Sequence, residues 1–238
     1  MSQTFMDLKK KNIEFNNSDP MHILDFCINQ QFLNKISYVC SFGSESAIIL
    51  HMISKLKKNL PIIFLNTHFL FEETLRYKEN LLNLLGLTNC IETYPKISDL
   101  NLYDKNNNLW KSNPDLCCNI RKVLPLDNVL KPYKAWISGR KNYHEGERKN
   151  LKIFDLVDDR VIVNPLKNFK LDKVLNYFID NDIPHHPLTK KNYFSIGCTN
   201  CTVPTKDRNL IRSGRWTQSK KTECGIFYKN DNEAPRKT

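Results

Sequence analysis

The segment ISYVCSFGSESAIILHMISKL, residues 36–56, decides the fold. Its first five residues form an apolar run that predicts a buried strand over Ile36–Cys40. Turn-forming residues at 41–46 break this run, and an apolar stripe at helical spacing then predicts a helix over Ala47–Leu56. A strand joined to a helix by a short loop is the first part of a βαβ unit.

The chain downstream repeats this alternation. Strands are predicted at 61–65, 90–94, 134–138 and 160–164, and helices at 72–85 and 171–181. The residues before 35 are expected to be helical, and turn formers and charges prevail after about residue 184. We therefore expect an α/β fold with a Rossmann-like parallel sheet flanked by helices, forming one domain overall. Its parts are an N-terminal helical segment (1–35), an α/β core (36–185) and a C-terminal tail (186–238) lying over the sheet's ligand edge.

Composition narrows the choice of location and partner. The 238 residues carry a formal charge of +11 and contain no apolar run of the length that a membrane span needs. The lysine-rich N-terminus does not resemble a secretory signal, so we expect a cytoplasmic protein with reduced thiols and no membrane partner. The basic excess suits an anionic partner such as a nucleotide, a nucleic acid or an acidic protein, and it equally suits plain solubility.

The loop Ser41–Ser46 is a candidate anion site. In a parallel sheet, the carboxyl end of a strand and the N-terminus of the next helix form a site for oxyanions. Gly43 allows close approach of the backbone, and the serines add hydroxyl donors. The alternative is an ordinary helix start with Ser44 as its N-cap. No Gly-Lys-Ser/Thr follows, so the loop is not a Walker A motif.

Four of the eight cysteines form two close pairs, Cys117-Cys118 and Cys198-x-x-Cys201. Adjacent cysteines are unusual in structural zinc sites, where gaps of two to four residues let the sulfurs converge. A cubane cluster presents separate iron corners to neighbouring sulfurs, so the pattern favours a [4Fe–4S] cluster. Zinc, or four unrelated buried cysteines, are the alternatives. The remaining cysteines at 27, 40 and 90 lie in predicted helix or strand runs and are expected to be buried.

A fifth cysteine, Cys224, stands alone near the C-terminus, after two lysines and Glu223. Positive neighbours lower the pKa of a thiol, whereas the glutamate opposes them. Cys224 is therefore a candidate nucleophile, or else an idle exposed thiol. Basic residues recur beside the cysteine motifs, and arginine binds phosphate and sulfate in a bidentate manner. They are Arg121, Lys122, Arg140, Lys141, Arg148, Arg212 and Arg215.

Together these motifs give the chain a resemblance to a known family. They are SFGSESAIIL, LNTHFLFEETL, CCNIRKVLPL, WISGRKNYHEGER, VNPL, IPHHPLT, SIGCTNCT, RSGRW and KTECGIF, between residues 36 and 227. The chain resembles the sulfonucleotide reductases, specifically the iron–sulfur-containing assimilatory adenylyl-sulfate (APS) reductases within the phosphoadenylyl-sulfate (PAPS) reductase family. The resemblance implies an adenine nucleotide alpha-hydrolase-like fold with a nucleotide-binding core and a cluster-binding, catalytic tail.

The resemblance also implies roles for single residues. Cys224 matches the family's nucleophile. The substrate-binding positions it implies are Ser41, Phe42, Gly43, Ser46, Thr67, Lys122, Arg148, Arg212 and Arg215. The implied [4Fe–4S] ligands are Cys117, Cys118, Cys198 and Cys201. In this family the cluster is thought to shape and polarise the site through the lysine at 122 and not to carry electrons in turnover.

The implied reaction is the reduction of APS to sulfite and AMP through a cysteine S-sulfonate, which thioredoxin or glutaredoxin resolves. No nucleic-acid partner is implied, and a homo-oligomer is compatible with the family. Three differences from the family stand out. Asn66 and His68 replace an Asp and a Gly, Phe227 replaces the histidine of the usual ECGIH ending, and the loop from Arg140 to Arg148 is a residue shorter than in some relatives.

Three other functions compete with this one. A reductase of the 3′-phosphorylated substrate, PAPS, is the first, although relatives specialised for it generally lack the cysteine pairs. A cluster-bearing, ATP-dependent tRNA-modifying enzyme is the second, although such enzymes usually carry a Ser-Gly-Gly-Lys-Asp-Ser loop. The third is a metal-binding or redox-sensing module in which Cys224 is idle.

Overall fold

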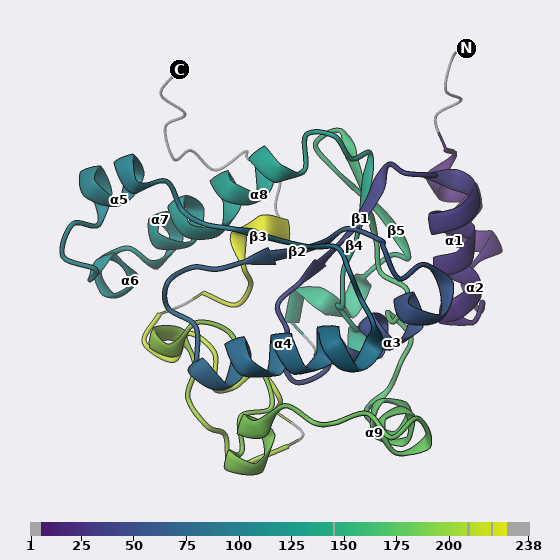
Figure 1. Ribbon diagram of the computed structural model, residues 1–238. Helices are drawn as coiled ribbons and strands as arrows, with labels where there is room; N and C mark the ends of the chain where they lie inside the picture. The colour runs from purple at the N-terminus through teal and green to yellow at the C-terminus, as the bar shows by residue number, and fades with distance from the viewer. Residues whose placement is uncertain (1–5, 145, 209, 220, 228–238) are drawn as a thin grey trace.

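A six-stranded sheet forms the centre of the computed structural model, which describes residues 6–227 apart from 145, 209 and 220 (Figure 1). The strand order is β3-β2-β1-β4-β6-β5. The strands are β1 (Ile36–Cys40), β2 (Ile62–Leu65), β3 (Cys90–Thr93), β4 (Ala135–Ile137), β5 (Phe154–Val157) and β6 (Arg160–Val163). All neighbours pair in parallel except β5 with β6, so the expected α/β fold is confirmed, with one antiparallel edge.

The central strand β1 sets the position of the site. β2 pairs with one of its edges and β4 with the other, at Tyr38↔Ile62 and Tyr38↔Ile137. The chain therefore moves outward from β1 in two opposite directions, which opens a crevice beyond the carboxyl ends of these strands. The loop 41–46, the segment after β2 and the segment after β4 all begin at that crevice.

Alternating side chains give the sheet two apolar faces. Ile62 and Phe64 of β2 point to the larger core, and Ile63 between them points to the smaller one, together with Trp136 of β4. The helices α3 (Ser46–Leu56), α4 (Glu72–Leu85) and α9 (Leu171–Asp180) lie on one side of the sheet in Figure 1, and α8 (Leu124–Val129) lies on the other. The N-terminal part adds α1 (Leu8–Glu14), α2 (Pro20–Asp25) and the π-helix η1 (Phe26–Gln31). None of the described helices combines the length and apolarity of a membrane span.

The edge strand β5 is absent from the sequence prediction. It forms a hairpin with β6 through the two-residue turn Asp158–Asp159, in which Asp158 has a φ of 54°. Such turns need residues that tolerate positive φ, and aspartate is among them. The two adjacent aspartates were therefore the signal for this hairpin.

The segment between β3 and β4 is helical, which the sequence patterns did not predict. It contains α5 (Ile97–Tyr103), α6 (Leu109–Ser112), α7 (Pro114–Cys118), the π-helix η2 (Asn119–Val123) and α8. Most of these helices are one or two turns long, too short to show a clear hydrophobic period. Cys117 and Cys118 end α7, and π-helical turns such as η2 are frequent at functional sites.

A buried ion pair holds this helical segment to the end of β2. Arg121 of η2 is 2% exposed. Its guanidinium donates to the Asp104 carboxylate at 2.7 Å and to the side-chain oxygen of Asn107 at 2.9 Å. It also donates to the Thr67 carbonyl at 2.8 Å and lies over the Phe69 ring at 3.9 Å. Arg121 is thus a structural residue that fixes the position of the adjacent cysteine pair.

Replacing Asp104 with alanine leaves the Arg121 charge buried and unpaired. We expect Asp104→Ala to lower the free energy of unfolding by about 3–5 kcal/mol. Glu72→Ala, which breaks the exposed Arg76–Glu72 pair, should cost less than about 1 kcal/mol. Urea unfolding of both variants measures the difference, and equal effects would contradict the structural role of the Arg121–Asp104 pair.

Candidate active site

The loop after β1 presents hydroxyl and backbone donors at the crevice. The Gly43 N–H donates to Ser46 Oγ at 3.0 Å, and Ser44 Oγ donates to the Phe194 carbonyl at 2.6 Å. The helix α3 begins at Ser46 with Glu45 at its N-cap position, so an N-cap role for Ser44 is wrong. Instead, Ser44 ties the loop to the C-terminal part of the chain.

Phe42 holds this loop in an unusual conformation. Its φ is 47°, in the left-handed region that bulky residues rarely adopt, and its side chain is fully buried against Phe64. Packing therefore stabilises a backbone shape that would be unfavourable in a free chain. Of the residues predicted to bind substrate, Phe42 is the one whose side chain packs in the core and does not line the cavity described below.

The segment after β2 contacts the second cysteine pair. Thr67 Oγ1 lies 3.2 Å from Cys198 Sγ, and the Thr199 N–H donates to the Phe69 carbonyl at 2.7 Å. His68 has a φ of 64°, where glycine carries no steric penalty. His68 therefore adopts this conformation at a cost that a glycine would not carry.

Arg215 lies against the chain at Gly197. A Cβ atom on Gly197 would lie 2.3 Å from Arg215 Nη2, so only glycine leaves room for the guanidinium. The guanidinium stacks on the Trp216 ring at 4.4 Å and donates to Ser195 Oγ at 3.4 Å. This close packing fixes Arg215 at the cavity wall.

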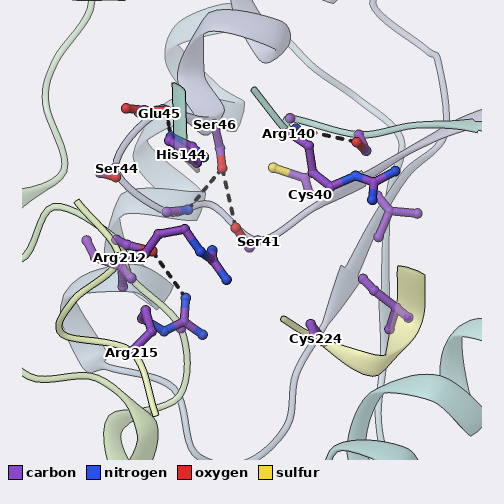
Figure 2. A pocket seen from close by; sticks show the side chains of 18 of the residues that line it. Cys40, Ser41, Ser44, Glu45, Ser46, Arg140, His144, Arg212, Arg215 and Cys224 are labelled. Carbon is purple, nitrogen blue, oxygen red and sulfur yellow. Dashed lines mark hydrogen bonds and ion pairs between the residues drawn. The ribbon is translucent and has the colours of Figure 1, made fainter. Parts of the chain in front are cut away.

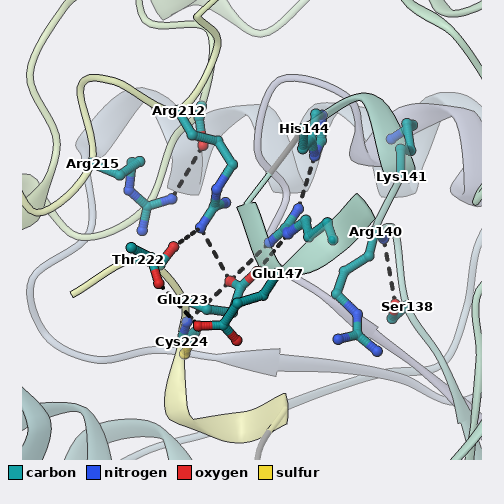
Figure 3. A network of polar contacts seen from close by, with 12 residues as sticks. Ser138, Arg140, Lys141, His144, Glu147, Arg212, Arg215, Thr222, Glu223 and Cys224 are labelled. Atoms are coloured by element: carbon teal, nitrogen blue, oxygen red, sulfur yellow. Dashed lines mark hydrogen bonds and ion pairs between the residues drawn. The ribbon is translucent and has the colours of Figure 1, made fainter. Parts of the chain in front are cut away.

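The tail is fastened by a carboxylate between two arginines (Figure 3). Arg148 donates to Glu223 in a bidentate manner, from Nε at 2.5 Å and from Nη2 at 2.9 Å. Arg212 donates to the same carboxylate at 3.1 Å and to the Thr222 carbonyl at 2.8 Å. Burial alone would raise the pKa of the Glu223 carboxyl, but Arg148 and Arg212 lower it to about 2. Glu223 is therefore ionised at neutral pH.

Cys224 follows this clamp directly. Its N–H donates to Glu223 Oε1 at 3.0 Å, and its sulfur pairs with the Cys118 thiol. The hydrogen bond from Cys118 and the charge of Lys122 hold the pKa of Cys224 well below its usual range, although burial opposes them. The pKa of the Cys118 thiol is raised in turn. Of these two thiols, Cys224 is the one whose pKa is lowered.

Phe227 docks the end of the described tail on the sheet. Its ring stacks on Trp136 with centroids 5.4 Å apart, and the Arg140 guanidinium lies 4.0 Å above it. The short helical turn η7 (Gly225–Phe227) joins the smaller apolar core through Ile226 and Phe227. The aromatic ring that replaces the family's histidine therefore has a packing role in this chain.

These elements enclose a cavity of about 200 Å³, part of which is shown in Figure 2. Most of the residues singled out in the sequence line it: Ser41, Gly43, Ser46, Thr67, Lys122, Arg148, Cys198, Arg212, Arg215 and Cys224. The sequence patterns missed Glu45, His144 and Trp216, which also line it. Their position depends on the fold, because no sequence motif assigns Glu45, His144 or Trp216 to a site.

Of the four paired cysteines, Cys198 lines this cavity, and the adjacent pair differs in its partners. Successive residues of a helix are turned by about 100°, so Cys117 and Cys118 have different neighbours. Cys117 interacts with Cys198 and Cys201, while Cys118 faces Cys224. Within the described residues, no three Cys, His, Asp or Glu side chains are grouped closely enough to hold a metal ion.

The donor chemistry of this region nevertheless suits a thiolate-bound cluster. Three of the four cysteines are buried, and burial raises the pKa of Cys117 to about 12, so metal binding would have to displace protons. Lys122 faces several of these sulfurs, and their influence raises its pKa although burial opposes it. A buried cation facing thiols is the environment that compensates an anionic cluster.

Comparison with known proteins identifies the family. The profile of the phosphoadenosine phosphosulfate reductase domain matches residues 35–204, and the chain belongs to this family.

Curated relatives agree with this assignment. A protein named adenosine 5′-phosphosulfate reductase from Chelativorans sp. (strain BNC1) is 42% identical over 191 residues, covering 80% of this chain and 78% of the relative. A protein of the same name from Mesorhizobium japonicum is 40% identical over 87% of this chain and 82% of the relative. A third, from Bacillus thuringiensis subsp. konkukian, is 35% identical over 94% of this chain and 99% of the relative.

Solved structures support the fold. The phosphoadenylyl-sulfate (PAPS) reductase of Candida auris, in a phosphate complex, superimposes with a TM-score of 0.71 at 24% identity, covering 85% of this chain and 99% of that one. An FMN adenylyltransferase from Candida glabrata matches with a TM-score of 0.57 at 14% identity, covering 87% of this chain and 70% of that one.

Gly197→Ala should displace Arg215 from the cavity wall. We expect AMP to bind at least about tenfold more weakly, since a charge-assisted hydrogen bond is worth roughly 1.5–3 kcal/mol. Calorimetric titration with AMP measures this loss. In the Arg215→Ala background the Gly197→Ala change should add little, and a full additional loss there would contradict an action through Arg215.

Phe227→Ala should loosen the tail, and it also removes one side chain from the cavity wall. Removing the ring also removes its contacts with Trp136 and Arg140, so Cys224 should react faster with iodoacetamide. Phe227→Trp keeps an aromatic surface and serves as the matched control. An unchanged alkylation rate in Phe227→Ala would show that Glu223 alone holds the tail.

Proposed function

We propose that this protein reduces adenosine 5′-phosphosulfate to sulfite and AMP, with Cys224 as the nucleophile and an S-sulfonate as the intermediate. Membership of the family and the names of its relatives support the reductase activity. The observation that carries the proposal is the position of Cys224, at the wall of a cavity that it shares with the loop 41–46 and the arginines.

The cavity matches a doubly anionic nucleotide. The donors of Ser41, Gly43 and Ser46 suit a phosphate, and Arg212 and Arg215 lie across the cavity from them (Figure 2). Attack of a thiolate on a sulfuryl group brings two anions together. Lys122 and Arg215, both near the Cys224 sulfur, reduce that repulsion and stabilise the charge that develops on the leaving phosphate.

In the first step, the Cys224 thiolate attacks the sulfur of the substrate. A sulfur–sulfur bond forms, the bond from sulfur to the bridging oxygen breaks, and its electron pair leaves on the phosphate of AMP. The docked tail keeps water from the sulfur, so the sulfo group passes to Cys224 and is not hydrolysed.

In the second step, a dithiol protein such as thioredoxin or glutaredoxin attacks the Sγ atom of Cys224. Sulfite leaves with the electron pair of the sulfur–sulfur bond, and the second thiol resolves the mixed disulfide. The dithiol is oxidised by two electrons, and the sulfur is reduced from sulfate to sulfite level. A cytoplasmic location would supply such dithiols.

Cys117, Cys118, Cys198 and Cys201 would hold the [4Fe–4S] cluster. When bound, the cluster supplies a fixed electrostatic centre beside Lys122. We propose further that the described part of the tail, 186–227, works with the core as one domain, since Ser44 and the Thr67–Phe69 segment both bond to it.

Cys224→Ser should abolish sulfite release while the protein keeps its iron. The serine oxygen lacks a thiolate's nucleophilicity, but it leaves the four paired cysteines in place. Sulfite is assayed anaerobically with APS and a dithiol protein. A parallel assay with PAPS in place of APS determines the preferred substrate. Retained activity, or loss of iron, would refute the separate roles of Cys224 and the paired cysteines.

Serine at any of the four paired cysteines should lower iron content and activity together. Cys90→Ser is the matched control, because Cys90 lies in the edge strand β3 away from the cavity. Iron and labile sulfide counts with a visible spectrum distinguish a cluster from zinc. Full iron content in all four variants would exclude these residues as ligands.

A further inference from the structure

A line of polar contacts joins the loop 41–46 to the tail cysteine. Glu45 Oε2 lies 3.1 Å from His144 Nε2, and His144 Nδ1 lies 2.8 Å from Arg148 Nη1. Arg148 then holds Glu223 through its other two nitrogens, and Glu223 accepts from the Cys224 N–H. Figure 3 shows His144, Glu223 and Cys224 along this line of contacts. The family resemblance assigns no role to His144.

The partners of His144 determine its tautomer. An arginine has only donors, so His144 Nδ1 must accept from Arg148 and cannot carry a proton. A neutral imidazole then bears its proton on Nε2, where the Glu45 carboxylate accepts it. An imidazolium would instead direct an N–H at the guanidinium.

The surroundings favour this neutral state. Burial lowers the pKa of His144, and the charges of Lys141 and Arg148 lower it further, while Glu45 opposes them. The Glu45 carboxylate is itself held by Lys141 at 2.8 Å and by the Tyr143 hydroxyl. The acceptor of the His144 proton is therefore ionised and fixed.

We propose that His144 is a positioning residue: in its Nε2–H tautomer it accepts from Arg148, orients the guanidinium toward Glu223, and so links the nucleotide loop to the docking of Cys224. The inference depends on the proposed function for its catalytic consequence. Its structural part, the coupling of His144 to tail docking, stands on the contacts alone.

Two substitutions of His144 each preserve the contact of one ring nitrogen and remove the contact of the other. In His144→Asn the amide oxygen replaces Nδ1 and still accepts from Arg148. In His144→Gln the amide nitrogen replaces Nε2 and still donates to Glu45, but the acceptor for Arg148 is lost. Neither residue is a charged group, so the net charge of the site is unchanged.

We expect His144→Asn to form the Cys224 S-sulfonate at close to the wild-type rate, in a single turnover with APS and no dithiol. His144→Gln should be about ten- to a hundredfold slower, since one hydrogen bond to a charged group is lost. AMP affinity should be the same in both variants. Without substrate, iodoacetamide should alkylate Cys224 faster in His144→Gln than in His144→Asn.

Equal rates in the two variants, whether fast or slow, would overturn the positioning role. If the wild type forms no S-sulfonate, the proposed function fails, while the alkylation rates still test the link from His144 to the tail. A measurement on the wild type needs no folded variant: nitrogen-15 NMR of labelled histidines should show His144 protonated on Nε2 alone. A proton on Nδ1 would refute the inference.

Discussion

The ion pairs of Glu223 with Arg148 and Arg212 are the interaction on which the rest of the site depends. They join the last described stretch of the chain to the loop after β4 and to the segment that follows the second cysteine pair. The carboxylate is 5% exposed, and an unpaired charge at that depth would be strongly unfavourable. Both arginines therefore hold the tail at the crevice, and this docking places Cys224 beside Lys122.

This arrangement divides the arginines by function. Arg148 makes hydrogen bonds to Glu223 and His144 with three of its nitrogens, so in this arrangement it holds the tail. Arg215 has no carboxylate within salt-bridge distance among the residues that the structure describes, and packing against Gly197 and Trp216 fixes it. Arg212 contacts both the tail and the cavity. We therefore propose that, of the three, Arg215 receives the substrate's anionic groups.

Much of the fold followed from the sequence because its strands are apolar runs bounded by turn formers. The runs at 36–40, 61–65 and 160–164 all form strands of the sheet. The hairpin strand β5 and the short helices between β3 and β4 did not follow, because charges interrupt the first and the second lack a measurable period. Short elements take their shape from tertiary contacts such as Arg121–Asp104.

The site was only partly predictable, for a related reason. Motifs indicated the loop 41–46, the cysteines and the arginines, since their residue types carry recognisable chemistry. Which arginine holds the tail, and that Phe227 stacks on Trp136, depends on distances between segments far apart in sequence. Glu223 is the instructive case: beside a nucleophilic cysteine its charge is unfavourable, and only the two guanidiniums explain its presence.

The central claim is that the tail cysteine receives the sulfo group. The most direct measurement mixes the anaerobic protein with APS in the absence of any dithiol and follows it by intact-protein and peptide mass spectrometry. If Cys224 receives the sulfo group, one SO₃ group per chain is added on the peptide that contains Cys224, and one equivalent of AMP is released. Release of AMP with no modified cysteine, or an SO₃ group on another residue, would contradict it.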